Sequence, residues 1–220
     1  MPPTDELVDL IAGRLDQLRA RITRAGGVGV TIVGVTKRHP IEVLHAAVAA
    51  GISDLGENYA QELVEKAATP GFDQLGARVH FIGQLQSNKV RMVAPIVDVI
   101  QTIDRPALVT EVARRSPGAE VMVQVDLTGI EGRGGASFET APGLAAAATD
   151  AGLTVIGVMG VAAPGDPDAS ARFTRLRSLR DELGVAECSM GMTDDLDDAV
   201  AAGATMVRVG SALFGARDGI

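Results

Sequence analysis

Thr31-Ile32-Val33-Gly34-Val35-Thr36-Lys37 is the stretch that decides the fold, and Arg38-His39-Pro40 follows it directly. Five of its seven residues are Val, Ile or Thr, which are enriched in β-strands. Pro40 has no amide hydrogen to give to a sheet, so the predicted strand ends beside Lys37. Ligands of α/β proteins bind at the C-terminal ends of parallel strands, which makes the Lys37 amine a candidate functional group.

The rest of the chain alternates predicted helices with predicted strands. Apolar residues at helical spacing from Leu7 to Ile22 predict an N-terminal helix, which is capped by Thr4 and ends at Gly26. Further strands are predicted at residues 53–56, 79–82, 96–102, 120–125, 154–158, 187–189 and 204–209. Helices are predicted between these strands, among them residues 58–68 and 194–202.

Three of the predicted helices end on a glycine directly before a strand, at Gly51, Gly152 and Gly203. This repetition indicates tandem βα units. We therefore predict an α/β fold, a (β/α)₈ TIM barrel with one extra N-terminal helix, in a single domain over residues 1–220. A doubly wound open sheet is the competing architecture, and spacing alone leaves it open.

Composition and charge favour a protein that acts on small molecules. The formal charge of −8 and the pI of about 4.9 argue against nucleic acid as a partner, because a phosphate backbone needs clustered Lys and Arg. Cys188 is the only cysteine, so we expect neither an intrachain disulfide nor a metal site. The N-terminus does not resemble a signal peptide and no apolar run has spanning length, so we expect a cytoplasmic protein without a membrane partner.

The loops after the last two strands resemble a phosphate site. Ser189-Met190-Gly191-Met192-Thr193 and Gly210-Ser211 combine small residues and hydroxyls with a helix start, which is where barrels commonly bind phosphate. Arg208 shares parity with Met206 and should point into the barrel, where it would disfavour the ammonium form of Lys37. A phosphorylated aldehyde such as pyridoxal phosphate fits an amine opposite a phosphate pocket.

Simpler interpretations exist for several of these residues. A lysine at a strand end can be a solvated surface charge, and Gly191 and Gly210 can be ordinary turn residues. Asn58 can be a helix cap, and His80, in the middle of a strand, is expected to be a hydrogen-bonded core histidine.

Six sequence strings, in order and in register from about residue 5 to residue 217, resemble the pyridoxal phosphate homeostasis proteins. They are Gly34-Val35-Thr36-Lys37, Gly56-Glu57-Asn58-Tyr59, His80-Phe81-Ile82-Gly83 with Leu85-Gln86-Ser87-Asn88-Lys89, Thr102-Ile103-Asp104-Arg105, Ser189-Met190-Gly191-Met192-Thr193-Asp194-Asp195, and Met206-Val207-Arg208-Val209-Gly210-Ser211-Ala212-Leu213-Phe214-Gly215. The fold of that family resembles the N-terminal barrel domain of alanine racemase. The loop 126–135 and Gln84 depart from the usual family pattern.

The resemblance implies roles for individual residues of the site. It makes Lys37 the Schiff-base lysine that attaches pyridoxal 5′-phosphate covalently, with Asn58 beside the cofactor. It makes Arg208 the residue that faces the pyridine nitrogen. It makes the loops after the last two strands the phosphate cradle, formed by Ser189, Met192, Thr193, Gly210 and Ser211. Met190 and Gly191, which lie between Ser189 and Met192, are also assigned to cofactor binding.

The leading hypothesis is a non-catalytic binder of pyridoxal phosphate that takes part in vitamin B6 homeostasis and delivery. Apo forms of pyridoxal phosphate-dependent enzymes are the candidate recipients, and we expect a monomer. The enzyme alternative is an amino-acid racemase, which needs a second proton acceptor. The sequence stops at Ile220, soon after the last predicted strand, so we expect such a base to come from elsewhere, such as Tyr59 or another subunit. A barrel enzyme that forms an imine between Lys37 and a sugar phosphate is a third possibility.

Overall fold

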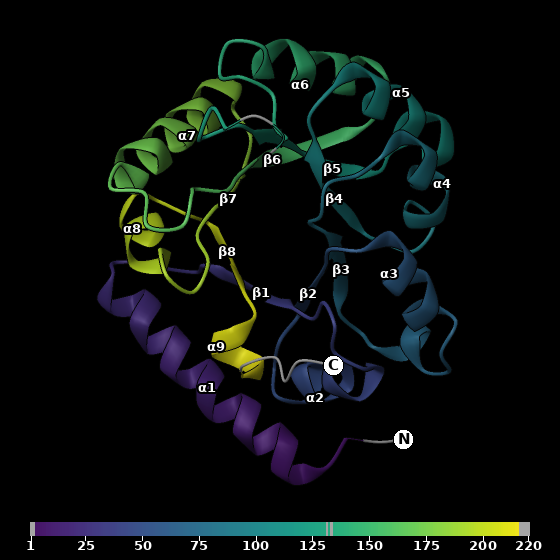
Figure 1. Ribbon diagram of the computed structural model, residues 1–220, viewed down its shortest axis with the longest axis vertical. Helices are drawn as coiled ribbons and strands as arrows, with labels where there is room; N and C mark the ends of the chain where they lie inside the picture. Colours follow the sequence, from purple (N-terminus) through teal and green to yellow (C-terminus); the bar gives the residue numbers. More distant parts are fainter. Residues whose placement is uncertain (1–2, 131, 133, 216–220) are drawn as a thin grey trace.

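Eight parallel strands close into a barrel in a computed structural model that describes residues 3–130, 132 and 134–215 (Figure 1). Glu131 and Arg133 of the divergent 126–135 loop lie outside the described residues. The strands are β1 (Thr31–Val35), β2 (Asp54–Glu57), β3 (Arg78–Phe81), β4 (Val99–Ile103), β5 (Glu120–Val125), β6 (Thr154–Gly160), β7 (Glu187–Ser189) and β8 (Met206–Val209). Each pairs with the next in parallel, and β1 closes the barrel by pairing with β8, with Val33 opposite Arg208. The predicted (β/α)₈ barrel is therefore confirmed.

Helices surround the barrel and connect its strands (Figure 1). They are α1 (Asp5–Arg24), α2 (Ile41–Ala49), α3 (Ala60–Ala67), α4 (Val90–Val93), α5 (Pro106–Arg115), α6 (Ala141–Asp150), α7 (Ala169–Leu183), α8 (Leu196–Ala201) and α9 (Ser211–Phe214), with two 3₁₀ turns, η1 (Phe72–Gln74) and η2 (Ser87–Lys89). The predicted extra helix is α1, whose Thr4 cap accepts a hydrogen bond from the Leu7 amide. Its buried face packs against α2, α8 and α9.

Side-chain alternation along the strands separates two cores. Leu55, Phe81, Cys188 and Val207 belong to the large core between the sheet and the helices. A smaller apolar cluster lies inside the barrel and is formed by Val33, Val99, Met122, Met159 and Met206. Because side chains of a strand alternate between its two faces, Arg208 shares the interior face with Met206, as the sequence predicted.

Several predicted boundaries are off by two or three residues. The first strand ends at Val35, because Arg38 takes a left-handed backbone with φ of 62° and the chain turns before Pro40. The helix predicted from Asn58 begins at Ala60, and the helix predicted from Asp194 begins at Leu196. Lys37 therefore lies just beyond the end of β1, on the loop that leads into α2.

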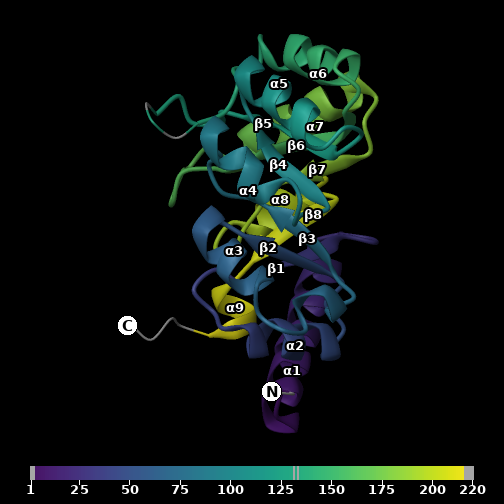
Figure 2. The same cartoon turned by 90° about the vertical axis from the view of Figure 1, so that its right-hand side faces the viewer.

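The segments that follow β5 and β6 extend from the same side of the barrel as α9 (Figure 2). This side holds the C-terminal ends of the strands, and we call it the mouth. Every residue implicated by the sequence lies on a segment that ends or begins there. None of the helices built from the described residues combines the length and apolar character that a membrane crossing requires.

Candidate functional site

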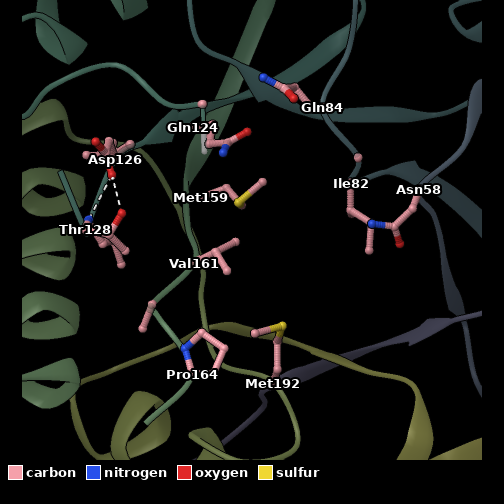
Figure 3. Close-up of a pocket in the computed structure, with 15 residues that line it drawn as sticks. Asn58, Ile82, Gln84, Gln124, Asp126, Thr128, Met159, Val161, Pro164 and Met192 are labelled. Atoms are coloured by element: carbon pink, nitrogen blue, oxygen red, sulfur yellow. Dashed lines mark hydrogen bonds between the residues drawn. The ribbon is translucent and has the colours of Figure 1, made fainter. Parts of the chain in front are cut away.

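A cavity of about 330 Å³ opens at the mouth (Figure 3). Most of its lining comes from the ends of β3, β5 and β6 and the loops that follow them, and Asn58 and Met192 complete it from the sides of β2 and β7. Met159 and Val161 line it on either side of Gly160, the last residue of β6. Of the predicted cofactor-binding residues, Asn58 and Met192 line this cavity, whereas Lys37 and Arg208 belong to the neighbouring β1 and β8 side of the mouth.

Asn58 contributes a buried polar atom to the site. Its Oδ1 atom has no hydrogen-bond partner among the described residues. The alternative that Asn58 caps α3 is wrong, because Tyr59 occupies the cap position and no side chain caps that helix. Gly83 approaches the Asn58 backbone so closely that a Cβ atom at position 83 would lie 1.9 Å from the Asn58 carbonyl oxygen. A buried, unpaired amide oxygen at the rim of a cavity is ready to accept a hydrogen bond from a bound molecule.

Opposite this cavity lining, a cluster of charged side chains holds the backbone on both sides of Lys37. The Lys66 ammonium donates to the Thr36 carbonyl oxygen at 2.8 Å, and the Thr36 hydroxyl donates to Glu57 Oε1 at 2.7 Å. The Arg38 amide donates to Glu62 Oε1 at 2.5 Å. The Thr36 side chain points outward to Glu57, and Lys37 follows it on the loop that leaves β1.

Lys66 joins the two carboxylates of this cluster. Its Nζ atom lies 2.6 Å from Glu57 Oε1 and 2.7 Å from Glu62 Oε1, and both Lys66 and Glu57 are buried. Burial raises the pKa of Glu57, and the neighbouring Lys66 ammonium opposes that rise. The short contact argues for an ion pair at neutral pH, so the ammonium of Lys66 is engaged in the wall behind Lys37.

Arg208 lies on the interior face of β8 and is 4% exposed. Its Nη1 donates to Ser189 Oγ and its Nη2 to the Gly160 carbonyl oxygen, both at 2.7 Å. Burial lowers the pKa of Arg208 to about 10, so the side chain remains a cation at neutral pH. Ser189 and Gly160 end their strands, and the guanidinium therefore lies at the floor of the mouth.

The two loops predicted to bind phosphate meet at the mouth. The hydroxyls of Thr193 and Ser211 lie 3.4 Å apart, one after β7 and the other at the start of α9, where Gly210 is the cap residue. Arg21 of α1 donates to the Thr193 carbonyl oxygen at 2.8 Å and supports this loop from behind. The Met192 amide already donates to Asp195 Oδ1 at 2.6 Å.

Other residues of these loops are engaged in the fold. Gly191 has φ of 89°, and a Cβ atom there would lie 2.5 Å from Ala199 Cβ, so its turn is a packing requirement. Met190 is fully buried in the outer core. The Ser189 hydroxyl points into the barrel and bonds to Gln101 and Arg208, which argues against its predicted contribution to the phosphate cradle.

Sequence reasoning missed Arg21, Glu57, Lys66 and Gln101 as supports of the site. Most of their partners are distant in sequence, although Glu62 and Lys66 form an i,i+4 pair on α3 that a helical pattern could have indicated. A charged residue at the end of a predicted buried strand, such as Glu57, is a further signal that was available. Within the part of the chain that the structure describes, no cluster of three or more His, Cys, Asp or Glu suits a metal ion.

Comparison with known proteins agrees with this geometry. Residues 9–218 match the family model of the alanine racemase N-terminal domain. The pyridoxal phosphate homeostasis protein of Pseudomonas aeruginosa is 36% identical over 223 residues, which cover 94% of this chain and 96% of the relative. The Escherichia coli K12 protein of the same name is 34% identical over 225 residues, which cover 92% of this chain and 93% of the relative.

A solved structure is similar over the same length. PipY of Synechococcus elongatus, solved with PLP bound, superimposes with a TM-score of 0.83 at 32% sequence identity, covering 93% of this chain and 100% of PipY. The family model and the relatives span almost the whole barrel, including every loop of the mouth. The chain therefore belongs to the alanine racemase N-terminal domain family and, within it, to the pyridoxal phosphate homeostasis proteins.

Proposed function

We propose that this protein binds pyridoxal 5′-phosphate at the mouth of the barrel and holds it reversibly on the Lys37 amine. In this proposal Thr193, Gly210 and Ser211 hold the phosphate, Asn58 lies beside the ring, and Arg208 faces the pyridine nitrogen. Met192, which lines the cavity, packs against the bound molecule. Residues 1–220 act as a single cofactor-binding domain.

The arrangement of β1 and β8 carries this proposal. The two strands pair, Lys37 follows the end of one, and the Arg208 guanidinium lies at the mouth end of the other. The residues fit the cofactor, because Asn58 offers an unpaired buried amide oxygen at the cavity and the loops after β7 and β8 bring the hydroxyls of Thr193 and Ser211 within 3.4 Å of each other at the mouth. The bound PLP of PipY and the names of the relatives support the same ligand.

Arg208 supports a holding role over a catalytic one. Bound pyridoxal phosphate supplies an aldehyde and, when its ring nitrogen is protonated, an electron sink. A guanidinium donates hydrogen bonds and accepts no proton, so Arg208 keeps a facing ring nitrogen unprotonated and weakens that sink. The protein then stores and delivers the cofactor in vitamin B6 homeostasis, acting as a cytoplasmic monomer with apo forms of pyridoxal phosphate-dependent enzymes as recipients.

Borohydride reduction followed by peptide mass mapping tests this proposal. The sequence contains three lysines, Lys37, Lys66 and Lys89, and the ammonium of Lys66 is engaged in the buried cluster. We expect a single adduct on Lys37 in protein loaded with pyridoxal phosphate and none in the Lys37→Ala variant. The Lys89→Ala variant serves as the matched control and should retain the adduct. An adduct on Lys66 or Lys89, or no adduct in the loaded wild-type protein, would contradict the proposal.

A further inference from the structure

A chain of buried polar side chains crosses the interior of the barrel. It begins at Arg208 on β8, continues through Ser189 on β7, Gln101 on β4 and His80 on β3, and ends at Asp54 on β2. The four contacts measure 2.7, 2.7, 2.9 and 2.9 Å between the bonded heavy atoms, in that order. All five residues are less than 9% exposed. The chain thus joins the wall formed by β2, β3 and β4 to the wall formed by β7 and β8 (Figure 1).

The direction of every hydrogen bond in this chain follows from its Arg208 end. A guanidinium only donates, so Ser189 Oγ accepts from it and gives its own single hydrogen to Gln101 Oε1. The amide nitrogen of Gln101 then faces His80 Nδ1, which must accept. The remaining hydrogen of a neutral imidazole is on Nε2, which donates to Asp54 Oδ1.

We propose that Ser189, Gln101, His80 and Asp54 are positioning residues that hold the Arg208 guanidinium at the floor of the mouth. This proposal rests on the proposed function for its consequence, because Arg208 is the group that faces the cofactor ring. This series of hydrogen bonds has a cation at one end and a carboxylate at the other, and every donor in it points toward the carboxylate end. An aligned chain of this kind polarises each of its members and favours a single arrangement of its side chains.

The rest of the interior strengthens this interpretation. The neighbours of the chain inside the barrel are apolar and include Val33, Val99 and Met122. Apart from Met206 Sδ, which accepts a hydrogen bond from the Gln101 amide at 3.1 Å, this surrounding offers few alternative partners, so a broken link would leave a buried donor or acceptor poorly paired. Ser53 also donates to the second Asp54 oxygen at 2.6 Å, which secures the far end of the chain.

The first experiment uses the protein without cofactor and reads the histidine tautomer by nitrogen-15 NMR. The sequence has three histidines, and the His39→Gln and His45→Gln variants assign the His80 signals. We expect hydrogen on Nε2 and none on Nδ1. The Gln101→Glu variant replaces the donor with a carboxylate of the same shape, so we expect His80 to gain a hydrogen on Nδ1. The Asp54→Asn variant keeps an acceptor for Nε2 and should leave the tautomer unchanged.

The second experiment uses protein loaded with pyridoxal phosphate. Loss of one charge-assisted hydrogen bond in the Ser189→Ala variant should weaken cofactor binding by about tenfold and shift the absorption band of the bound cofactor. The Ser189→Thr variant retains the hydroxyl and should restore the wild-type band. The exposed Ser170 on α7 provides the control variant Ser170→Ala, which should behave like the wild-type protein.

The two experiments separate failure of this inference from failure of the proposed function. Hydrogen on Nδ1 of His80 in the wild-type protein, or an unchanged tautomer in Gln101→Glu, would overturn the polar chain whether or not the cofactor binds. An unaltered absorption band and affinity in Ser189→Ala would overturn the positioning role. Absence of cofactor binding by the wild-type protein would instead contradict the proposed function and leave the NMR result to decide the direction of the chain.

Discussion

Replacement of Lys66 by methionine tests whether the buried charge cluster supports the strand end that carries Lys37. Methionine keeps the length of the side chain and most of its apolar volume but removes the ammonium. The change therefore deletes three contacts, to the Thr36 carbonyl oxygen, Glu57 and Glu62, at 2.6 to 2.8 Å. Glu57 is then left as a buried carboxylate that keeps only its hydrogen bond from the Thr36 hydroxyl, and its Oε2 atom already has no partner among the described residues.

The magnitude follows from the burial of the pair. The side chains of Lys66 and Glu57 are 7% and 1% exposed, whereas that of Glu62 is 21% exposed and is partly solvated. Removing one partner of a buried ion pair typically destabilises a protein by roughly 3–5 kcal/mol. We expect the Lys66→Met variant to lose a free energy of unfolding in this range at neutral pH. The Lys66→Met/Glu57→Gln double variant should regain much of that loss, because it removes the unpaired charge.

The loss should depend on pH in a definite direction. The folded pKa of Glu57 is raised above its ordinary value of 4.5 by burial, so the folded state holds this proton more tightly than the unfolded state. The contribution of Glu57 to stability is then fully present below the ordinary pKa and is lost as pH rises through the folded pKa. Without the Lys66 ammonium the folded pKa rises further, so the deficit of the variant should grow as the pH rises above the ordinary pKa of Glu57.

Urea unfolding at several pH values measures this effect, with the midpoint and slope fitted together. The Lys89→Met variant is the matched control, because Lys89 lies in η2, outside the cluster, and it should change stability by less than about 0.5 kcal/mol. The reasoning fails if Lys66→Met unfolds within that same margin of the wild-type protein. It fails equally if the deficit shrinks as pH rises.

Three further outcomes are expected. Gly83→Ala should destabilise the fold by more than about 4 kcal/mol in thermal unfolding, because its Cβ would meet the Asn58 carbonyl oxygen at 1.9 Å, whereas Gly13→Ala meets no atom within 4 Å and should not destabilise α1. Cys188 is buried, and burial raises the pKa of its thiol to about 12, so a thiol reagent at neutral pH should label unfolded protein only; rapid labelling of native protein would contradict this. Protein loaded with pyridoxal phosphate and incubated with L-alanine should produce no D-alanine on chiral chromatography, and sustained exchange would favour the racemase alternative.

The barrel was predictable because its signals are local. Most of the strands contain a short β-branched or apolar run, β2 and β7 being the exceptions, and glycines at helix ends mark the return to the next strand. Two strands match their predicted bounds residue for residue, Glu120–Val125 and Glu187–Ser189. The inward direction of the Arg208 side chain was also predicted correctly, because it follows from the alternation of side chains between the two faces of one strand.

Most supports of the site were not predictable, because they depend on contacts between residues that are distant in the sequence. The Ser189 hydroxyl meets an amide 88 positions away in Gln101, and His80 meets Asp54 across 26 positions. Ser189 was assigned to the phosphate cradle because it opens the string that leads to Thr193. Its parity on β7 directs it into the barrel instead, and a strand of three residues gives too little pattern to reveal that.

Strand β2 connects the two charge networks of the mouth. Asp54 and Glu57 are three residues apart on this strand, so their side chains leave opposite faces of the sheet. Asp54 points inward and ends the chain that holds Arg208, whereas Glu57 points outward and pairs with Lys66 behind Lys37. The backbone beside Lys37 and the guanidinium of Arg208 are thus both supported from one four-residue strand, which is separated from β8 only by β1. A shift of β2 by one residue would exchange the faces of both carboxylates and would disrupt both networks at once, which explains why Asp-Leu-Gly-Glu is the arrangement that this site requires.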